Sequence, residues 1–293
     1  MKIKELFDEK KVVFSFEIFP PKTTSSIETI YSTLEELKDL KPYYISVTYG
    51  SGGSMRDNKT TELSSLVKNK YGIEAVAHLT CINSSKEEIK YYLEQLKQNN
   101  IENVLALRGD VPINGKIKGE LRHANELIQY IKKIEKNDFN IAAACYPEGH
   151  TENKSLSLEI DNMKRKEEAG ASYFISQLFF DNESYYYFQD KARAANIKAP
   201  IEAGIMPVTN KKQIERMISL SGASLPTKFK KIIDKFEYNP EALRDAGIAY
   251  AVEQIVDLVS TGVDGIHLYV MNNTYLAKRI NENIKNIVNT VNK

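Results

Sequence analysis

Short apolar segments alternate with segments of mixed polarity along almost the whole chain. Continuous apolar runs are typical of parallel strands that are buried on both faces. Eight such runs predict strands at residues 12–18, 43–48, 74–79, 103–107, 140–145, 173–178, 200–205 and 265–270. In the stretches between them, apolar residues recur every three or four positions, which predicts amphipathic helices.

Two of the predicted helices carry a starting signal. Ser25 and Glu28 stand at the spacing of a capping box, at the head of an apolar stripe that includes Ile30. Ser84 and Glu87 have the same spacing ahead of another stripe. In a capping box, each of the two side chains bonds to the backbone N–H of the other residue. We therefore expect Ser25 and Ser84 to begin helices.

Eight strand–helix units predict a single (β/α)8 TIM barrel, a fold of the α/β class. The chain of 293 residues suits one such domain, spanning 1–293. The stretch from Pro207 to Gly262 is long and predicts an elaboration between strands seven and eight, with an extra helix near residues 228–236. An open doubly wound sheet is the alternative, which is disfavoured because strands run to both ends of the chain.

Charge and composition narrow the classes of partner. Lys and Arg number 40 against 39 Asp and Glu, so the formal net charge of +1 gives no general basis for binding nucleic acid or an anionic membrane. No apolar run approaches the roughly 20 residues that span a bilayer. The first residues also lack a signal-peptide pattern. We therefore expect a cytoplasmic protein with no nucleic-acid or membrane partner.

The residue types that usually hold metals are few and unsuitably spaced. Cys81 and Cys145 form no CxxC pair, and the four histidines match no zinc-binding spacing. A disulfide framework and a metal site are therefore not expected. The sequence contains no GxGxxG, so it gives no support for a Rossmann mode of nucleotide binding.

A parallel barrel carries its functional groups at the carboxyl ends of the strands. The first predicted strand contains Glu17, which lies in the sequence among Phe14, Phe16 and Phe19. Apolar surroundings favour the protonated form of a carboxyl group, which suits a general acid. A glutamate bonded to loop amides is the structural alternative at this position.

Several further segments, most of them at strand ends, are rich in polar and aromatic residues. Eight segments follow one another between residues 14 and 210: FSFEIFPPKT, YISVTYG, AHLTC, LALRGD, CYPEGH, NMKRKEEAGA, ISQLFFD and GIMPVTN. In this order they resemble the methylenetetrahydrofolate reductase family closely. The resemblance implies a flavoprotein barrel of one-carbon metabolism and methionine biosynthesis. Such an enzyme uses FAD, reduced by NADH or NADPH, to convert 5,10-methylenetetrahydrofolate to 5-methyltetrahydrofolate.

The resemblance also implies roles for individual residues. Glu17 matches the family's general acid, which is thought to help open the bridging ring of the folate, and Asp110 matches a carboxylate near the flavin and the pterin. Gln177 and Gln213 match contacts to the folate or the nicotinamide. The positions that match FAD contacts are Thr48, Tyr49, His78, Arg108, Gly109, Asp110, His123, Ala124, Tyr146, His150, Glu159, Asn162, Arg165 and Lys166.

The resemblance is qualified at one segment and at one single position. The run from Lys164 to Lys166 is expected to contact phosphate, with a solvated helix face as the alternative. Asn273 stands where enzymes of the family from enteric bacteria have an arginine that is thought to pair with the glutamate tail of the folate. Asparagine supplies no charge, so we expect selection for that tail to be weaker.

Two other functions remain open from the sequence. In the first, the same folate chemistry takes its electrons from a partner subunit. That subunit would have to hold any iron–sulfur cluster, because two cysteines are too few to hold one in this chain. Alternatively, the barrel is a non-redox aldolase or a ligand-binding protein. The family usually forms dimers or tetramers, so a homo-oligomer is expected. The sequence does not choose between NADH and NADPH.

Overall fold

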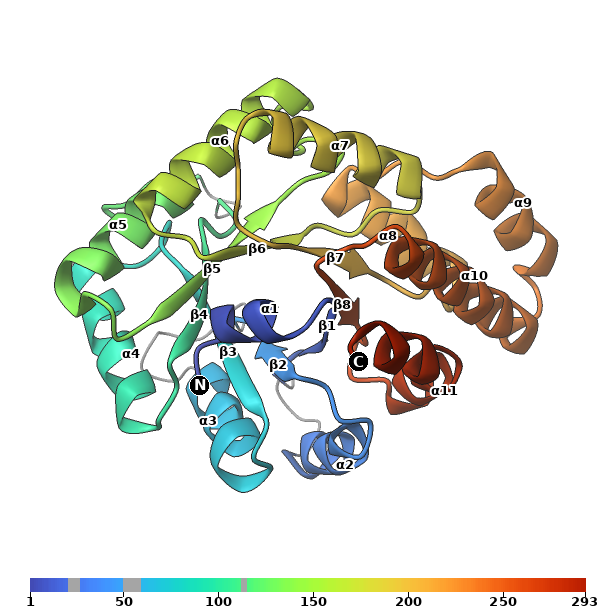
Figure 1. Ribbon diagram of the computed structural model, residues 1–293, viewed down its shortest axis with the longest axis horizontal. Helices are drawn as coiled ribbons and strands as arrows, with labels where there is room; N and C mark the ends of the chain where they lie inside the picture. The colour runs from blue at the N-terminus through green and yellow to red at the C-terminus, as the bar shows by residue number, and fades with distance from the viewer. Residues whose placement is uncertain (21–26, 50–58, 112–114) are drawn as a thin grey trace.

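Eight parallel strands close into a barrel in the computed structural model, which describes residues 1–20, 27–49, 59–111 and 115–293 (Figure 1). The strands are β1 (Val13–Ile18), β2 (Tyr44–Val47), β3 (Glu74–Thr80), β4 (Asn103–Leu107), β5 (Asn140–Cys145), β6 (Tyr173–Ser176), β7 (Ile201–Ile205) and β8 (Gly265–Tyr269). Each strand pairs with the next, and β8 pairs with β1. The predicted barrel is confirmed, and each predicted strand end lies within two residues of the observed one.

Helices surround the barrel (Figure 1). They are α1 (Lys4–Glu9), α2 (Ile27–Lys38), α3 (Lys59–Ser65), the π-helical turn η2 (Leu66–Lys70), α4 (Lys86–Gln98), α5 (Ala124–Glu135), α6 (Leu156–Ala169), α7 (Asn182–Ala194), α8 (Lys211–Ser221), α9 (Thr227–Phe236), α10 (Pro240–Ser260) and α11 (Thr274–Val291). Between β7 and β8 lie α8, α9 and α10 in place of one crossover helix. The predicted elaboration is confirmed, and α9 is its extra helix.

The capping box predicted at Ser84 and Glu87 is wrong by one residue. Ser85 caps α4: its hydroxyl accepts from the Glu88 backbone N–H at 3.2 Å, and the Glu88 carboxylate accepts from the Ser85 backbone N–H at 2.8 Å. Two serines and two glutamates in succession satisfy the spacing in either register, and Ser84 is buried beneath the helix start. The capping box predicted at Ser25 lies outside the described residues.

Strand alternation divides the side chains of β1 between two cores. Phe14 and Phe16 pack edge to face, with ring centroids 5.1 Å apart, in the main core that the strands share with the surrounding helices. Val13 belongs to a different cluster, which includes Tyr44 and Leu6. Because successive strand residues point to opposite faces, Val13, Ser15 and Glu17 share the barrel interior.

The amino end of the barrel is filled by apolar side chains under α1, which lies over the barrel centre in Figure 1. Ile3 and Leu6 are buried there with Val13, Val76 and Leu105. A barrel interior is a packed core rather than a pore. The amino-terminal segment therefore completes this core.

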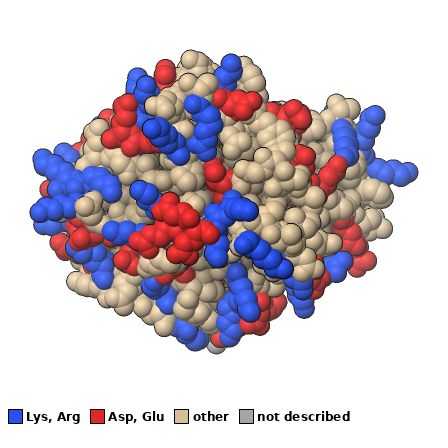
Figure 2. Space-filling model, viewed as in Figure 1, with Lys and Arg blue, Asp and Glu red and all other residues tan. Residues whose placement is uncertain are grey.

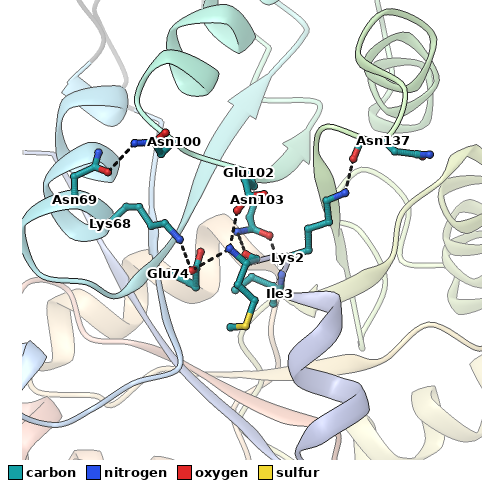
Figure 3. A network of polar contacts seen from close by, with 10 residues as sticks. Lys2, Ile3, Lys68, Asn69, Glu74, Asn100, Glu102, Asn103 and Asn137 are labelled. Carbon is teal, nitrogen blue, oxygen red and sulfur yellow. Dashed lines mark hydrogen bonds and ion pairs between the residues drawn. The ribbon is translucent and has the colours of Figure 1, made fainter.

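A polar network surrounds the amino terminus (Figure 3). The Met1 amine lies 2.6 Å from a Glu102 carboxylate oxygen and 3.2 Å from Glu74, which also pairs with Lys68. The Asn103 side chain donates to the Met1 carbonyl at 3.1 Å. Acidic and basic side chains are interspersed over the face of the molecule in Figure 2. Charges on this side of the barrel are therefore largely neutralised by one another.

Candidate active site

A cavity of about 490 Å³ opens where β4 and β5 end and α5 and α6 begin. Its position agrees with the general location of active sites in parallel barrels. Nine of the fourteen residues predicted to contact FAD line it: Arg108, His123, Ala124, Tyr146, His150, Glu159, Asn162, Arg165 and Lys166. The fold thus brings together residues from four segments that are distant in the sequence.

One face of α6 forms a wall of the cavity. Glu159, Asn162 and Lys166 are three and four residues apart, so they lie on the same side of the helix. The Lys166 amine donates to the Ala144 carbonyl at 2.8 Å and lies 3.6 Å from Glu159 Oε1, beyond hydrogen-bond distance. Burial raises the pKa of Glu159. Its Oε1 atom is buried without a hydrogen-bond partner among the described residues.

Aromatic side chains form a second wall. The rings of Tyr146 and His150 meet edge to face with centroids 4.7 Å apart, and the Lys166 amine lies 5.8 Å from the centre of the Tyr146 ring. Burial raises the pKa of Tyr146. Burial, and to a smaller extent the positive charge of Arg108, lowers the pKa of His150. Both rings are therefore uncharged near pH 7. They offer flat, uncharged surfaces beside the cations of the cavity.

Arg108 is held across the cavity mouth by a carboxylate that the sequence did not single out. Its guanidinium makes two hydrogen bonds to Glu152, at 2.7 and 2.8 Å. These bonds raise the pKa of Arg108 and lower that of Glu152. The next residue, Gly109, has a φ of +84°, and a Cβ there would lie 3.0 Å from the Thr80 Cβ. A glycine is needed at this turn, which places Arg108 at the cavity.

Glu17 lies apart from that cavity, at the top of the barrel interior. It is only 7% exposed. Its Oε2 atom is 3.4 Å from His78 Nε2, 3.5 Å from His267 Nε2 and 3.5 Å from the Ser46 hydroxyl, which donates. Burial lowers the pKa of His78 to about 4, so this imidazole is neutral near pH 7. The carboxyl group is enclosed by polar side chains of β2, β3 and β8.

The aromatic surroundings predicted for Glu17 are wrong. Phe14 and Phe16 are neighbours in sequence, but they belong to the core between strands and helices. Because side chains alternate along a strand, the two phenylalanines point out of the barrel. Glu17 points into the barrel interior, where it lies beside Ser46 and the histidines. Glu17 is buried by a polar cluster rather than by phenylalanines.

The other predicted FAD contacts are Thr48, Tyr49, His78, Gly109 and Asp110, which do not line the cavity. Tyr49 follows β2 and packs edge-on against Tyr92, with centroids 6.1 Å apart. Asp110 is exposed two residues after Arg108. Their roles toward a flavin stay predictions.

The three predicted substrate contacts are each held by local hydrogen bonds, and none of them lines the cavity. Gln177 follows β6, and its side-chain oxygen accepts from the next backbone N–H at 2.9 Å. Gln213 lies in the first turn of α8 and accepts from Thr209 at 2.8 Å. Asn273 is the N-cap of α11, where its side chain accepts from the Leu276 N–H at 3.2 Å. Asn273 therefore begins a helix, whatever its role toward the folate.

Sequence reasoning missed Glu152 at the cavity, and Ser46 and His267 beside Glu17. A weak signal for His267 exists, because it is the polar residue at an inward position of the otherwise apolar Gly265–Tyr269. The predicted barrel places its eighth strand beside its first, but the sequence does not give the register that sets His267 next to Ser15.

Within the described parts of the chain, no three His, Cys, Asp or Glu side chains gather in a way that could hold a metal ion. Both cysteines are buried and unpaired. Among the same residues, no helix has the length and apolar character that crossing a membrane requires.

Comparisons with known proteins agree with the geometry. The family model for methylenetetrahydrofolate reductase matches residues 2–285. The chain is 36% identical over 270 residues to a 5,10-methylenetetrahydrofolate reductase of Pectobacterium carotovorum subsp. carotovorum, covering 92% of this chain and 89% of the relative. It is 35% identical over 266 residues to the enzyme of the same name from Escherichia coli (strain K12), covering 91% and 88%.

A solved structure shares the fold at low sequence identity. It is an uncharacterized protein from Clostridium thermocellum that binds two copies of 5-methyl-5,6,7,8-tetrahydrofolic acid. The TM-score is 0.74 at 14% identity, covering 99% of this chain and 100% of that one. At this identity the likeness shows the barrel fold alone.

Proposed function

The chain belongs to the methylenetetrahydrofolate reductase family, whose members are oxidoreductases, and from that membership we propose an FAD-dependent enzyme driven by NADH or NADPH. It would reduce 5,10-methylenetetrahydrofolate to 5-methyltetrahydrofolate. The observation that carries the flavin in this proposal is the convergence of nine predicted contact residues on one cavity.

The residues of the cavity fit FAD in size and in chemistry. A volume of about 490 Å³ lies within the usual range for cofactor sites. Arg108, Arg165 and Lys166 supply cations for the two phosphates. The unpartnered Oε1 of Glu159 is an acceptor for a ribose hydroxyl, and Tyr146 offers a ring for packing. These groups come from different elements, so the site is preformed by the fold.

The reduction requires a hydride at the methylene carbon and a proton at the folate nitrogen that is released when the bridging ring opens. FAD, when bound, would supply the chemistry of hydride transfer between the nicotinamide and the folate. Glu17 donates the proton, because its carboxyl group is buried at the top of the barrel interior and its described contacts all fall on Oε2. The carboxylate of Asp110 offsets the positive charge that develops on the folate before the hydride arrives.

The partners expected from the sequence follow from this proposal. The substrates are methylenetetrahydrofolate and a reduced nicotinamide dinucleotide. A homodimer or homotetramer and a cytoplasmic location stay predictions. The glutamate tail of the folate is expected to be weakly selected, since Asn273 is uncharged and its side-chain oxygen caps α11.

The visible spectrum of the purified protein tests the flavin directly. We expect flavin absorbance that is bleached anaerobically by NADH or NADPH and restored by methylenetetrahydrofolate. Lys166→Ala should weaken FAD binding, whereas Lys164→Ala should not, because Lys164 is exposed and does not line the cavity.

Two outcomes would contradict the proposal in different ways. A colourless protein that does not bind added FAD favours the non-redox alternative. A flavin that dithionite reduces, but that neither nicotinamide reduces, favours the alternative in which a partner subunit supplies the electrons.

A further inference from the structure

Polar side chains cross the barrel interior behind Glu17, and the proposed function does not use them. The ring of His267 is fully buried. Its Nδ1 atom lies 2.7 Å from Ser15 Oγ, and its Nε2 atom lies 3.3 Å from Ser46 Oγ and 3.5 Å from Glu17 Oε2. The imidazole therefore connects Ser15 on one side with Ser46 and Glu17 on the other.

Aromatic neighbours fix the orientation of this imidazole. The Tyr44 ring stacks on it with centroids 6.0 Å apart and an angle of 24°, and the Tyr269 ring meets it edge-on at 5.3 Å. Tyr44 is itself held by a hydrogen bond from its hydroxyl to Glu202. Packing on this scale restricts rotation of the ring, so the same nitrogen faces Glu17 throughout.

The contacts to Glu17 fall on one of its two carboxyl oxygens. Ser46, His78 and His267 all approach Oε2, and no described residue donates to Oε1. This asymmetry suits a proton donor, because it leaves Oε1 available to a substrate within hydrogen-bond reach. Of the two histidines, His267 is the one whose second nitrogen is anchored by a described side chain, Ser15.

We propose that His267 is a positioning residue for Glu17. In this proposal the Ser15 hydroxyl is assigned as the donor to Nδ1, 2.7 Å away, which leaves the proton on Nε2 and directs it at Glu17 Oε2. This contact holds the carboxyl group with Oε1 toward the folate and stabilises the carboxylate that remains after the proton has moved. No proton leaves His267 in this scheme. The inference rests on the proposed role of Glu17 as the acid.

Two substitutions separate positioning from packing. The side-chain amide of Gln can reach the place of imidazole Nε2, whereas that of Asn reaches only the place of Nδ1. We expect His267→Asn to slow flavin reoxidation by methylenetetrahydrofolate about 10- to 100-fold, and His267→Gln to restore most of that rate. Flavin content and flavin reduction by the nicotinamide should stay within a few-fold of wild type in both. Stopped-flow absorbance measures each step separately.

Ser15→Ala is the second variant, because it removes the anchor and leaves the imidazole in place. It should also slow reoxidation by the folate and spare reduction by the nicotinamide. Equal losses in both steps, or no loss in either, for His267→Asn and Ser15→Ala would overturn the positioning role.

Glu17→Gln in the same experiment keeps the two claims distinct. If it leaves the folate step at the wild-type rate, the proposed acid is wrong. If Glu17→Gln is slow while His267→Asn and Ser15→Ala are normal, only the positioning role of His267 is rejected.

Discussion

The two ends of the barrel use their charged groups differently. At the amino end, the Met1 amine, Lys68, Glu74 and Glu102 form one network in which opposite charges meet (Figure 3). At the carboxyl end, Arg108, Arg165 and Lys166 converge on a cavity together with acidic and aromatic side chains. The first arrangement closes a core, and the second surrounds a space that a ligand can fill.

Buried polar atoms without partners sharpen the contrast. An unsatisfied buried polar group costs about 1–3 kcal/mol. Glu159 Oε1 lies at the cavity and His78 Nε2 lies beside Glu17, so both face places assigned to a ligand or a proton. Two buried polar atoms at the other end of the barrel, Asn140 Nδ2 and Tyr173 OH, also have no hydrogen-bond partner among the described residues. A buried polar atom without a hydrogen-bond partner therefore indicates a functional site only where it lies at a cavity or beside a reactive group.

The largest expected effect on stability is at the amino end. Leu6 is buried under the barrel, and Leu6→Ala should lower the free energy of unfolding by about 2–5 kcal/mol. FAD affinity should stay within about two-fold, since the cavity is at the other end. Urea unfolding and flavin titration measure the two quantities. A parallel loss of FAD affinity would show that the ends are coupled.

At the carboxyl end we expect the opposite pattern, a loss of FAD affinity with little change in stability. Arg108→Ala should weaken FAD binding about 10- to 100-fold, because a hydrogen bond to a charged group contributes about 1.5–3 kcal/mol. The free energy of unfolding should change by less than about 1 kcal/mol, since Arg108 pairs with an exposed carboxylate. Arg122→Ala is the matched control, because Arg122 is exposed and outside the cavity. Equal weakening in both variants would argue against a specific phosphate contact.

Glu202 lies between the two ends and gives a pH-dependent test. Burial raises its pKa from 4.5 to about 8. The folded state then holds a proton that the unfolded state loses, so stability falls as pH rises from 4.5 to 8. Burial lowers the pKa of His78 from 6.5 to about 4, which has the opposite effect, since stability is lost as pH falls below 6.5. The window from pH 6.5 to 8 therefore isolates Glu202.

In that window we expect wild type to lose about 1–2 kcal/mol of unfolding free energy relative to Glu202→Gln. Urea unfolding at several pH values measures the difference. Parallel pH curves for the two proteins would show that Glu202 does not titrate as its burial requires.

The smallest expected effect on FAD affinity comes from Glu152, the carboxylate that is hydrogen-bonded to Arg108. Glu152→Gln removes a charge that competes with a phosphate for the guanidinium. Exposed ion pairs contribute about 0–1 kcal/mol, so FAD affinity should rise by up to about five-fold. Glu168→Gln, on an exposed position of α6 outside the cavity, is the control. A loss of affinity would mean that Glu152 holds Arg108 in place for the ligand.

Strand positions were predictable because buried parallel strands are continuous apolar runs. The cavity residues were predictable through the resemblance to the family, which motifs such as LALRGD and CYPEGH carry. The helix start at Ser85 was not, because two adjacent serines satisfy the same local rule. The surroundings of Glu17 also escaped prediction, because the barrel fold alone does not fix the register between β1 and β8 that sets His267 beside Ser15.

We propose that the flavin cavity and the proton donor, Glu17, are two distinct sites at the carboxyl end of the barrel. Stopped-flow absorbance of Glu17→Gln tests it most directly. Flavin content and reduction by the nicotinamide should remain within a few-fold of wild type, because neither needs a proton from this carboxyl group. Reoxidation by methylenetetrahydrofolate should slow about 10²- to 10⁴-fold, the usual contribution of general acid catalysis. Equal loss in both steps, or a wild-type folate step, would contradict the account.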